Sequence, residues 1–360
     1  MDYNELQSKT ISFLRFPLIV AVVFIHAYSA STTAQGGGSA PEMVYPVYDS
    51  IRYLISQVIA RIAVPLFFFT SGFLFFYKIN KNWNLHIYVD KLKKRSKTLL
   101  IPYIFWNALV LLLYFIAQNT PQLSSFFSGN NLLIKDYTII DFFKAFWSMD
   151  NSPTKAPFLF TFWFIRDLIV IVILSPLVYL LVKYLKIYGI LLLCIIWFFK
   201  FYSIVGLNSA CLFFFSFGAY FSINNLNFLK VFNRFYYPTA ILYSILAMLD
   251  LITKNTLIHN AGILVGLILL FNIVAFGIKN NKLHISVFLS SASFFLFAFH
   301  EPWLDFLRRF LFVYIKPASE LEFLFIYFIP TLFIIALSLL VYFLLKKIIP
   351  RFTNIITGGR

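Results

Sequence analysis

The sequence predicts an all-α protein that crosses a membrane about ten times, with both termini in the cytoplasm. Of its 360 residues, 61% are hydrophobic and only 12% are charged, whereas soluble domains carry roughly a quarter charged residues. Several stretches of about 18 or more nearly uncharged residues each match the length that a helix needs to cross the hydrocarbon layer. The solvent of this chain is therefore lipid.

Apolar windows separated by polar breaks predict the membrane spans in chain order. They lie near 11–30, 55–77, 98–118, 160–182, 188–204, 206–222, 235–252, 258–278, 287–304 and 323–345. Two loops between them are long, at 31–54 and 119–159, and neither can hold a separate catalytic domain. We therefore expect residues 1–360 to form a single transmembrane domain.

Basic residues are numerous, and their distribution predicts orientation. The net charge is +16 and the pI about 9.7, but the Lys and Arg residues sit mainly in short loops between apolar spans, which is not the pattern of a nucleic-acid interface. The predicted outside loops hold few, among them Arg308 and Arg309. The bias predicts a multi-pass protein of the cell (inner) membrane, with lipid and no nucleic acid as its partner.

The first span carries two polar side chains on one face. Arg15 and His26 are eleven residues apart, which places them about 20° from eclipsed and roughly 16 Å apart along a helix. They could line a path by which an extended anionic donor enters from the cytoplasm. Alternatively, Arg15 snorkels to the inner surface and His26 bonds a neighbouring helix. A cleaved signal peptide is a third reading, but Arg15 and Pro17 interrupt its apolar run.

Four predicted spans place an ionisable side chain at a similar depth. His26 and His300 lie roughly 20 Å above the cytoplasmic boundary, while Arg61 and Asp167 enter about 10 Å from the opposite side. Ionisable groups are costly in lipid and usually face a cavity or a partner. A shared polar pocket is therefore a hypothesis, because depth does not show which helices touch.

Two further polar features each have two interpretations. The basic segment from Lys91 to Lys97 can bind phosphates or anionic lipid heads, or it can simply anchor the topology. Arg166 and Asp167 can form an ion pair between helices, or Asp167 can orient a catalytic histidine. Because they are adjacent, their side chains leave a helix about 100° apart and need not contact each other.

Small residues in the spans are expected to serve packing. Ser71-Gly72 is typical of a notch for close helix approach, and a nucleophilic serine is disfavoured because no G-x-S-x-G motif surrounds it. Cys194 and Cys211 have no CxxC or Cys/His spacing that would hold zinc. We expect both cysteines to be packing residues and predict no metal site.

Several motifs follow one another in order along nearly the whole chain. They are Arg15 with His26, Arg61-x-x-Val64-Pro65-Leu66-Phe67-Phe68-Phe69-x-Ser71-Gly72-Phe73-Leu74, Leu99-Leu100-Ile101-Pro102-Tyr103, Phe162-Trp163-Phe164-x-x-Asp167-Leu168, Ser175-Pro176-Leu177, Phe214-x-x-Phe217-Gly218-x-Tyr220 and Ser293-Phe294-Phe295-Leu296-x-x-Phe299-His300-Glu301-Pro302. This arrangement resembles the acyltransferase-three family of bacterial integral membrane O-acyltransferases, relatives of enzymes that O-acetylate surface polysaccharides. One departure is that Arg95 fits the first of the family's paired loop arginines, while Thr98 or Lys97 stands at the second.

The resemblance implies transfer of an acyl group, usually acetyl and sometimes succinyl, from cytoplasmic acyl-CoA to a hydroxyl of an extracytoplasmic or lipid-linked glycan. Acyl-CoA is then a co-substrate, and no other cofactor is implied because the thioester supplies the activation energy. The implied roles are donor binding by Arg15, Arg95 and Lys97, and base or acyl carrier for His26. His300 and Asp167 are further catalytic candidates. The other intramembrane polar residues are Arg61, Arg166 and Glu301.

Two other classes of function fit the same composition. A transporter, exporter or flippase of an acyl compound or lipid-linked sugar would also carry buried charges in about ten helices. It would tolerate loss of His26. A non-catalytic scaffold is disfavoured by the cost of keeping so many ionisable groups in lipid.

Overall fold

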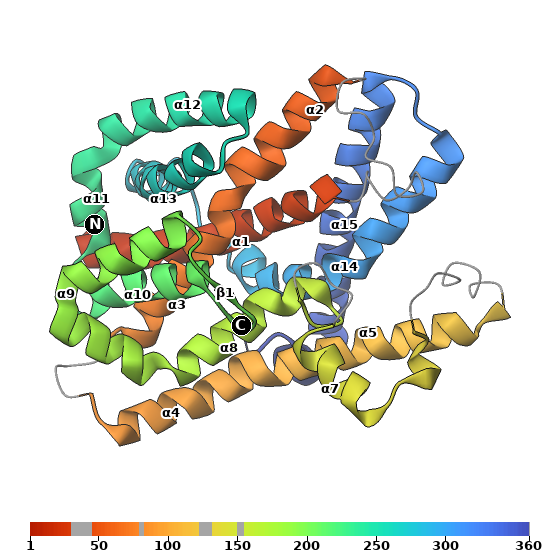
Figure 1. The fold of residues 1–360 in the computed structure, drawn as a ribbon, viewed down its shortest axis with the longest axis horizontal. Coiled ribbons are helices and arrows are strands. Elements are labelled where there is room, and N and C mark those ends of the chain that lie inside the picture. Colours follow the sequence, from red (N-terminus) through yellow and green to blue (C-terminus); the bar gives the residue numbers. More distant parts are fainter. Residues whose placement is uncertain (30–44, 79–82, 122–131, 150–154, 360) are drawn as a thin grey trace.

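The computed structural model describes residues 1–29, 45–78, 83–121, 132–149 and 155–359. The described chain is almost entirely helical, which confirms the predicted all-α class (Figure 1). Eight helical runs in it are long and apolar enough to cross a membrane. They are Tyr3–Tyr28, Pro46–Phe76, Leu85–Asn119, Ser175–Phe198, Phe228–Thr253, Thr256–Lys279, Val287–Ile315 and Glu320–Ile348. The cytoplasmic placement of the termini stays a prediction.

The elements follow one another with short connections. The α-helices are α1 (Tyr3–Ser29), α2 (Pro46–Tyr53), α3 (Ala63–Phe76), α4 (Leu85–Arg95), α5 (Ile101–Asn119), α7 (Ile139–Trp147), α8 (Trp163–Ile173), α9 (Ser175–Phe198), α10 (Ser209–Ile223), α11 (Phe228–Phe232), α12 (Tyr236–Thr253), α13 (Thr256–Lys279), α14 (Val287–Ile315), α15 (Glu320–Ile348) and α16 (Pro350–Ile356). The two strands are β1 (Ser203–Ile204) and β2 (Leu207–Asn208), which pair antiparallel.

Helices extend into segments that the hydropathy pattern assigned to loops. Between α2 and α3 the chain stays helical through a π-helical turn, Leu54–Ile59, and a 3-10 turn, Ala60–Ile62. The basic segment is helical too, because a π-helical turn at Ser96–Leu100 joins α4 to α5. The predicted loop 119–159 contains α7. Of the two predicted loops, residues 31–44, 122–131 and 150–154 lie outside the described residues.

The predicted fourth and fifth spans correspond to α8 and a folded-back α9. Lys186, in the middle of α9, has φ 50° and ψ −131°, and Figure 1 shows the helix reversing direction there. A Cβ on Gly189 would lie 2.9 Å from the side chain of Leu181, eight residues earlier. In a continuous helix residues eight apart are about 12 Å apart. The two halves of α9 therefore pack against each other.

The ninth span was predicted to end at 304, and that boundary is wrong. Proline interrupts helical hydrogen bonding, and at Glu301, before Pro302, the backbone leaves helical geometry with φ −106° and ψ 137°. The helix resumes at once and α14 continues to Ile315. Arg308, expected in an outside loop, is consequently fully buried.

Glycines set the closest helix contact, between α3 and α10. A Cβ on Gly72 would lie 2.0 Å from the carbonyl oxygen of Phe215, and one on Gly218 would lie 1.9 Å from that of Phe69. No larger residue fits either position without moving a backbone. The predicted small-residue notch at Gly72 is confirmed, and small residues allow helices to approach in lipid.

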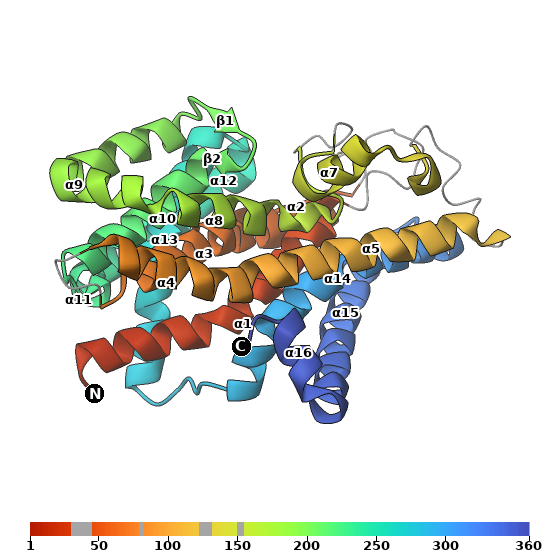
Figure 2. The same cartoon turned by 90° about the horizontal axis from the view of Figure 1, so that it is seen from below.

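The helix α1 lies at the centre of the bundle, where it contacts α3, α13, α14 and α15 (Figure 1). The run from α4 to α5 crosses the molecule as one long rod, and α7 lies beside its distal half (Figure 2). There Leu111, Ile134 and Ala145 form a small apolar core of their own. The central position of α1 brings Arg15 and His26 into the protein interior.

Candidate active site

A cavity of about 400 Å³ runs along α1. Both Arg15 and His26 line it, so the cavity follows that helix for roughly 16 Å. The other elements around it are α3, α8, α13, α14 and the turn Ser96–Leu100 that follows Arg95. The prediction that Arg15 and His26 share one face is confirmed, because one cavity exposes both.

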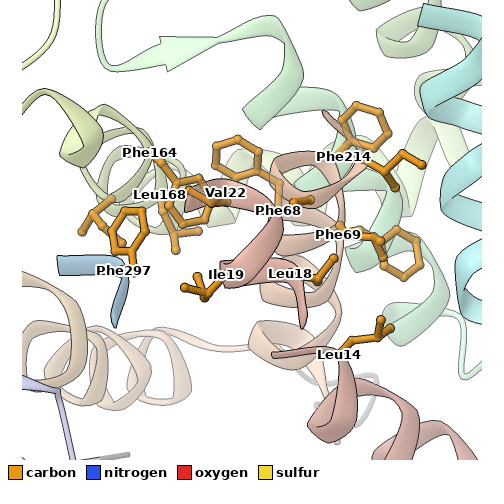
Figure 3. Close-up of a cluster of buried hydrophobic side chains, with 14 of the residues drawn as sticks. Leu14, Leu18, Ile19, Val22, Phe68, Phe69, Phe164, Leu168, Phe214 and Phe297 are labelled. Atoms are coloured by element: carbon orange, nitrogen blue, oxygen red, sulfur yellow. The ribbon is translucent and has the colours of Figure 1, made fainter. Parts of the chain in front are cut away.

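The middle of the cavity is apolar. Figure 3 shows part of its wall, with Leu14, Leu18, Ile19 and Val22 along α1 and Phe164, Leu168 and Phe297 from α8 and α14. Such side chains exclude water from the space between the two polar ends. An extended molecule with an apolar middle therefore fits the cavity better than a compact polar one.

One end of the cavity is cationic. Arg15 and Arg95 both line it, and they lie close enough for the charge of Arg15 to act on Arg95. The Arg95 guanidinium also lies 5.9 Å from the centre of the Phe75 ring. Within the described residues neither arginine forms an ion pair with a carboxylate. Lys97, predicted as a third donor-binding residue, is exposed and does not line the cavity.

At the other end His26 lies beside His300. Their ring centroids are 5.3 Å apart with the planes inclined by 37°, and Phe160 packs edge-on against His26 at 5.1 Å. His300 is completely buried. Its Nδ1 lies 3.2 Å from the Leu296 carbonyl oxygen, and a carbonyl can only accept, so Nδ1 carries the proton. Nε2 is then an acceptor, and it has no partner among the described residues.

Arg61 joins the histidines at this end. It lines the cavity from the 3-10 turn, donates from Nε to Gln57 Oε1 at 2.8 Å, and acts on His26 with its charge. The buried hydroxyl of Thr161 also lines the cavity and has no hydrogen-bond partner in the described part of the chain. Three of the four polar residues predicted to share a layer, His26, His300 and Arg61, therefore come together.

The fourth, Asp167, lies in a separate network. Arg166 donates to its Oδ1 from Nε at 3.0 Å and from NH2 at 2.9 Å, and Asn208 donates to its Oδ2 at 2.6 Å. Arg166 also donates to the carbonyl oxygens of Trp147 and Lys155. The two adjacent side chains contact each other because the long Arg side chain folds back. Asp167 does not line the cavity, so its predicted catalytic role has no contact to support it.

The remaining predicted residues lie at or near the break in α14. Glu301 is buried, and its Oε2 has no hydrogen-bond partner among the described residues. Arg308, one helical turn and more beyond it, donates to the carbonyl oxygen of Ala27, the residue that follows His26. This contact ties the far half of α14 to the end of α1. Cys194 and Cys211 are free and packed within the bundle, as predicted.

The sequence reasoning missed a second histidine in the cavity. His259 lines it from α13, and its Nδ1 lies 2.8 Å from Oδ2 of Asp250 on α12. Both residues fall at the edges of predicted spans, so they were read as loop residues. A carboxylate and a histidine facing each other across a short helix connection is the signal that could have found them.

Comparison with known proteins gives one family and one relative. A sequence model described as an acyltransferase domain matches residues 9–345. The succinoglycan biosynthesis protein ExoH of Rhizobium meliloti (strain 1021) is 27% identical over 248 residues, which cover 67% of this chain and 60% of that relative. The match thus spans less than two thirds of the relative's length. No solved structure matches this chain.

Proposed function

Because this chain belongs to the acyltransferase domain family, we propose that it moves an acyl group from cytoplasmic acyl-CoA to a hydroxyl of an extracytoplasmic or lipid-linked glycan. The acyl group we favour is acetyl, with succinyl as the next choice. The relative is named for the biosynthesis of succinoglycan, and this supports a polysaccharide or its lipid-linked precursor as the acceptor. The proposed location is the cell (inner) membrane.

The observation that carries the proposal is the single cavity joining Arg15 to His26. Guanidinium groups suit phosphate because their planar donors form charge-assisted hydrogen bonds to its oxygens. Arg15 and Arg95 would therefore hold the phosphates of the donor. Its extended arm would lie along the apolar wall, and the thioester would reach the histidines.

The chemistry at that end needs a group that exchanges protons near neutral pH, and imidazole does so. His26 lines the cavity and acts at the thioester in either of two ways. As a base, it takes the acceptor proton while the acceptor oxygen attacks the carbonyl carbon and the C–S bond breaks. As an acyl carrier, its ring nitrogen attacks first, and the acceptor oxygen then displaces that nitrogen. In both cases CoA leaves as the thiolate.

The first experiment supplies radiolabelled acetyl-CoA to purified protein in liposomes with membrane glycan, and compares the parent with His26→Ala. We expect label in glycan with the parent and a loss of about 10²-fold or more with His26→Ala. His86→Ala is the matched control, because His86 is highly exposed and does not line the cavity. If the parent consumes neither acetyl-CoA nor succinyl-CoA, the transporter becomes the better explanation.

A further inference from the structure

Asp250 and His259 form a buried carboxylate–imidazole pair that the proposed function leaves without a role. The Asp250 side chain is 4% exposed and that of His259 is 22% exposed. Tyr53 donates to Oδ1 of the carboxylate at 3.2 Å, while His259 Nδ1 meets Oδ2 at 2.8 Å. Both carboxylate oxygens are thus engaged, and the ring is held in one orientation.

The hydrogen bond decides which nitrogen of His259 is reactive. An ionised carboxylate can only accept, so Nδ1 of the neutral ring donates and Nε2 carries the lone pair. His259 lines the same cavity as His26, beside Asn260 and Lys200. The Asn260 amide donates to the carbonyl oxygen of Phe198 and is thereby occupied. The basic nitrogen of His259 therefore belongs to a side chain that a molecule in the cavity can touch.

The pair also lies near the centre of the proposed reaction. Arg61 lines the cavity and its charge acts both on His26 and on Tyr53, and Tyr53 holds Asp250. The sequence of neighbours from His26 through Arg61 and Tyr53 to Asp250 leads to His259. Two histidines from different helices, α1 and α13, thus serve one cavity at the end away from Arg15.

We infer that His259 is the general base for the acceptor hydroxyl and that Asp250 is its positioning residue. This inference rests on the proposed function. Nε2 of His259 takes the hydroxyl proton as the acceptor oxygen bonds to the acyl carbonyl carbon. The bond from that carbon to the donor sulfur, or to His26 if it carries the acyl group, breaks in the same step. His26 is then left to act on the donor side, with an uncharged hydroxyl compound bound near His259.

An exposed pair elsewhere in the chain provides a matched comparison. His86 and Asp90 lie 3.4 Å apart on α4, and their side chains are 86% and 51% exposed. They have the same chemistry without burial and without a cavity. His86→Ala and Asp90→Asn should leave transfer unchanged, and any effect of purification or assay conditions on histidine variants will show in them.

The experiment measures transfer of label from acetyl-CoA to glycan in liposomes for the parent, His259→Ala, Asp250→Asn and the double variant. We expect His259→Ala to lower kcat by about 10²-fold while CoA binding, measured separately, stays as in the parent. Free imidazole should restore part of the rate to His259→Ala, because it can enter the space left by the ring. Asp250→Asn should lower kcat by at least about tenfold alone and have no further effect in the His259→Ala background.

Three outcomes would overturn the inference. One is a His259→Ala variant that transfers label at the parent rate. Another is a loss that imidazole does not restore in protein that still binds CoA. The third is an Asp250→Asn effect that multiplies with that of His259→Ala, because a residue acting only through His259 has nothing left to position. If His259→Ala does not fold, His259→Gln replaces it. A parent that transfers nothing refutes the proposed function instead.

Discussion

The imidazole rings of His26 and His300 lie side by side, with centroids 5.3 Å apart, although one belongs to α1 and the other to α14. The first ring lines the cavity and the second is completely buried behind it. This relationship gives His300 two separable properties. It fills space against His26 and Phe297, and it carries a ring nitrogen with no hydrogen-bond partner in the described chain.

Replacing His300 by Phe separates packing from proton chemistry. The ring and most of its contacts remain, while both nitrogens are lost. If the nitrogen supports His26, kcat for acyl transfer falls by about tenfold or more with little change in KM for the donor. The measurement is steady-state transfer in liposomes over a range of acyl-CoA concentrations. A Phe variant as active as the parent would show that His300 only packs.

Arg15→Gln should weaken donor binding with little effect on the chemistry. A hydrogen bond to a charged group contributes about 1.5–3 kcal/mol, so KM for acyl-CoA should rise roughly 10- to 100-fold. Arg95→Gln should behave alike, because both side chains line the cavity. The effect should vanish with an acyl-pantetheine that lacks the nucleotide phosphates.

Lys97→Gln is the control for these arginine variants. Lys97 lies in the same basic segment but is exposed and away from the cavity, so KM for acyl-CoA should equal that of the parent. A rise in KM with Lys97→Gln as large as with Arg95→Gln would mean that general surface charge, rather than the cavity, attracts the donor.

Asp167→Asn should reduce stability more than activity. Breaking a buried ion pair costs about 3–5 kcal/mol, because the remaining charge is left uncompensated, and Arg166 would keep its charge beside the Trp147 and Lys155 carbonyls. Thermal unfolding followed by size-exclusion chromatography measures the loss. Glu5→Gln, which breaks the exposed pair with Lys9, should change little. A stable Asp167→Asn protein without activity would instead support the catalytic role that the sequence predicted.

Gly218→Ala should destabilise the bundle at its tightest contact. The added methyl would lie 1.9 Å from the Phe69 carbonyl oxygen, and α3 and α10 would have to separate, at a cost of about 1–3 kcal/mol. Gly262→Ala is the matched control, because a Cβ there meets nothing within 4 Å. The same thermal assay should show a lower midpoint only for Gly218→Ala. Equal behaviour of the two variants would refute the close approach.

The apolar pattern alone predicted most of the helices and several of their faces. Runs of uncharged residues in lipid must satisfy their backbone groups internally, and a helix does so. The period of the helix then places Arg15 and His26 on one face without any knowledge of neighbours. Gly72 was predictable for a related reason, since only a small residue permits close approach of two helices.

Only the tertiary structure decided which polar residues meet. Depth in the membrane was similar for His26, Arg61 and Asp167, yet Asp167 is held by Arg166 and Asn208 outside the cavity. The break at Glu301, which ended the predicted span, instead lets α14 continue and bury Arg308.

The pairing of His259 with Asp250 depends in the same way on how α12 packs against α13. Hydropathy and helical period are properties of one segment, so the sequence by itself determined the spans, their polar residues and the shared face of Arg15 and His26. Hydrogen bonds and shared cavities join segments that are distant in sequence, so the tertiary structure alone decided the partners of His26, Asp167 and His259.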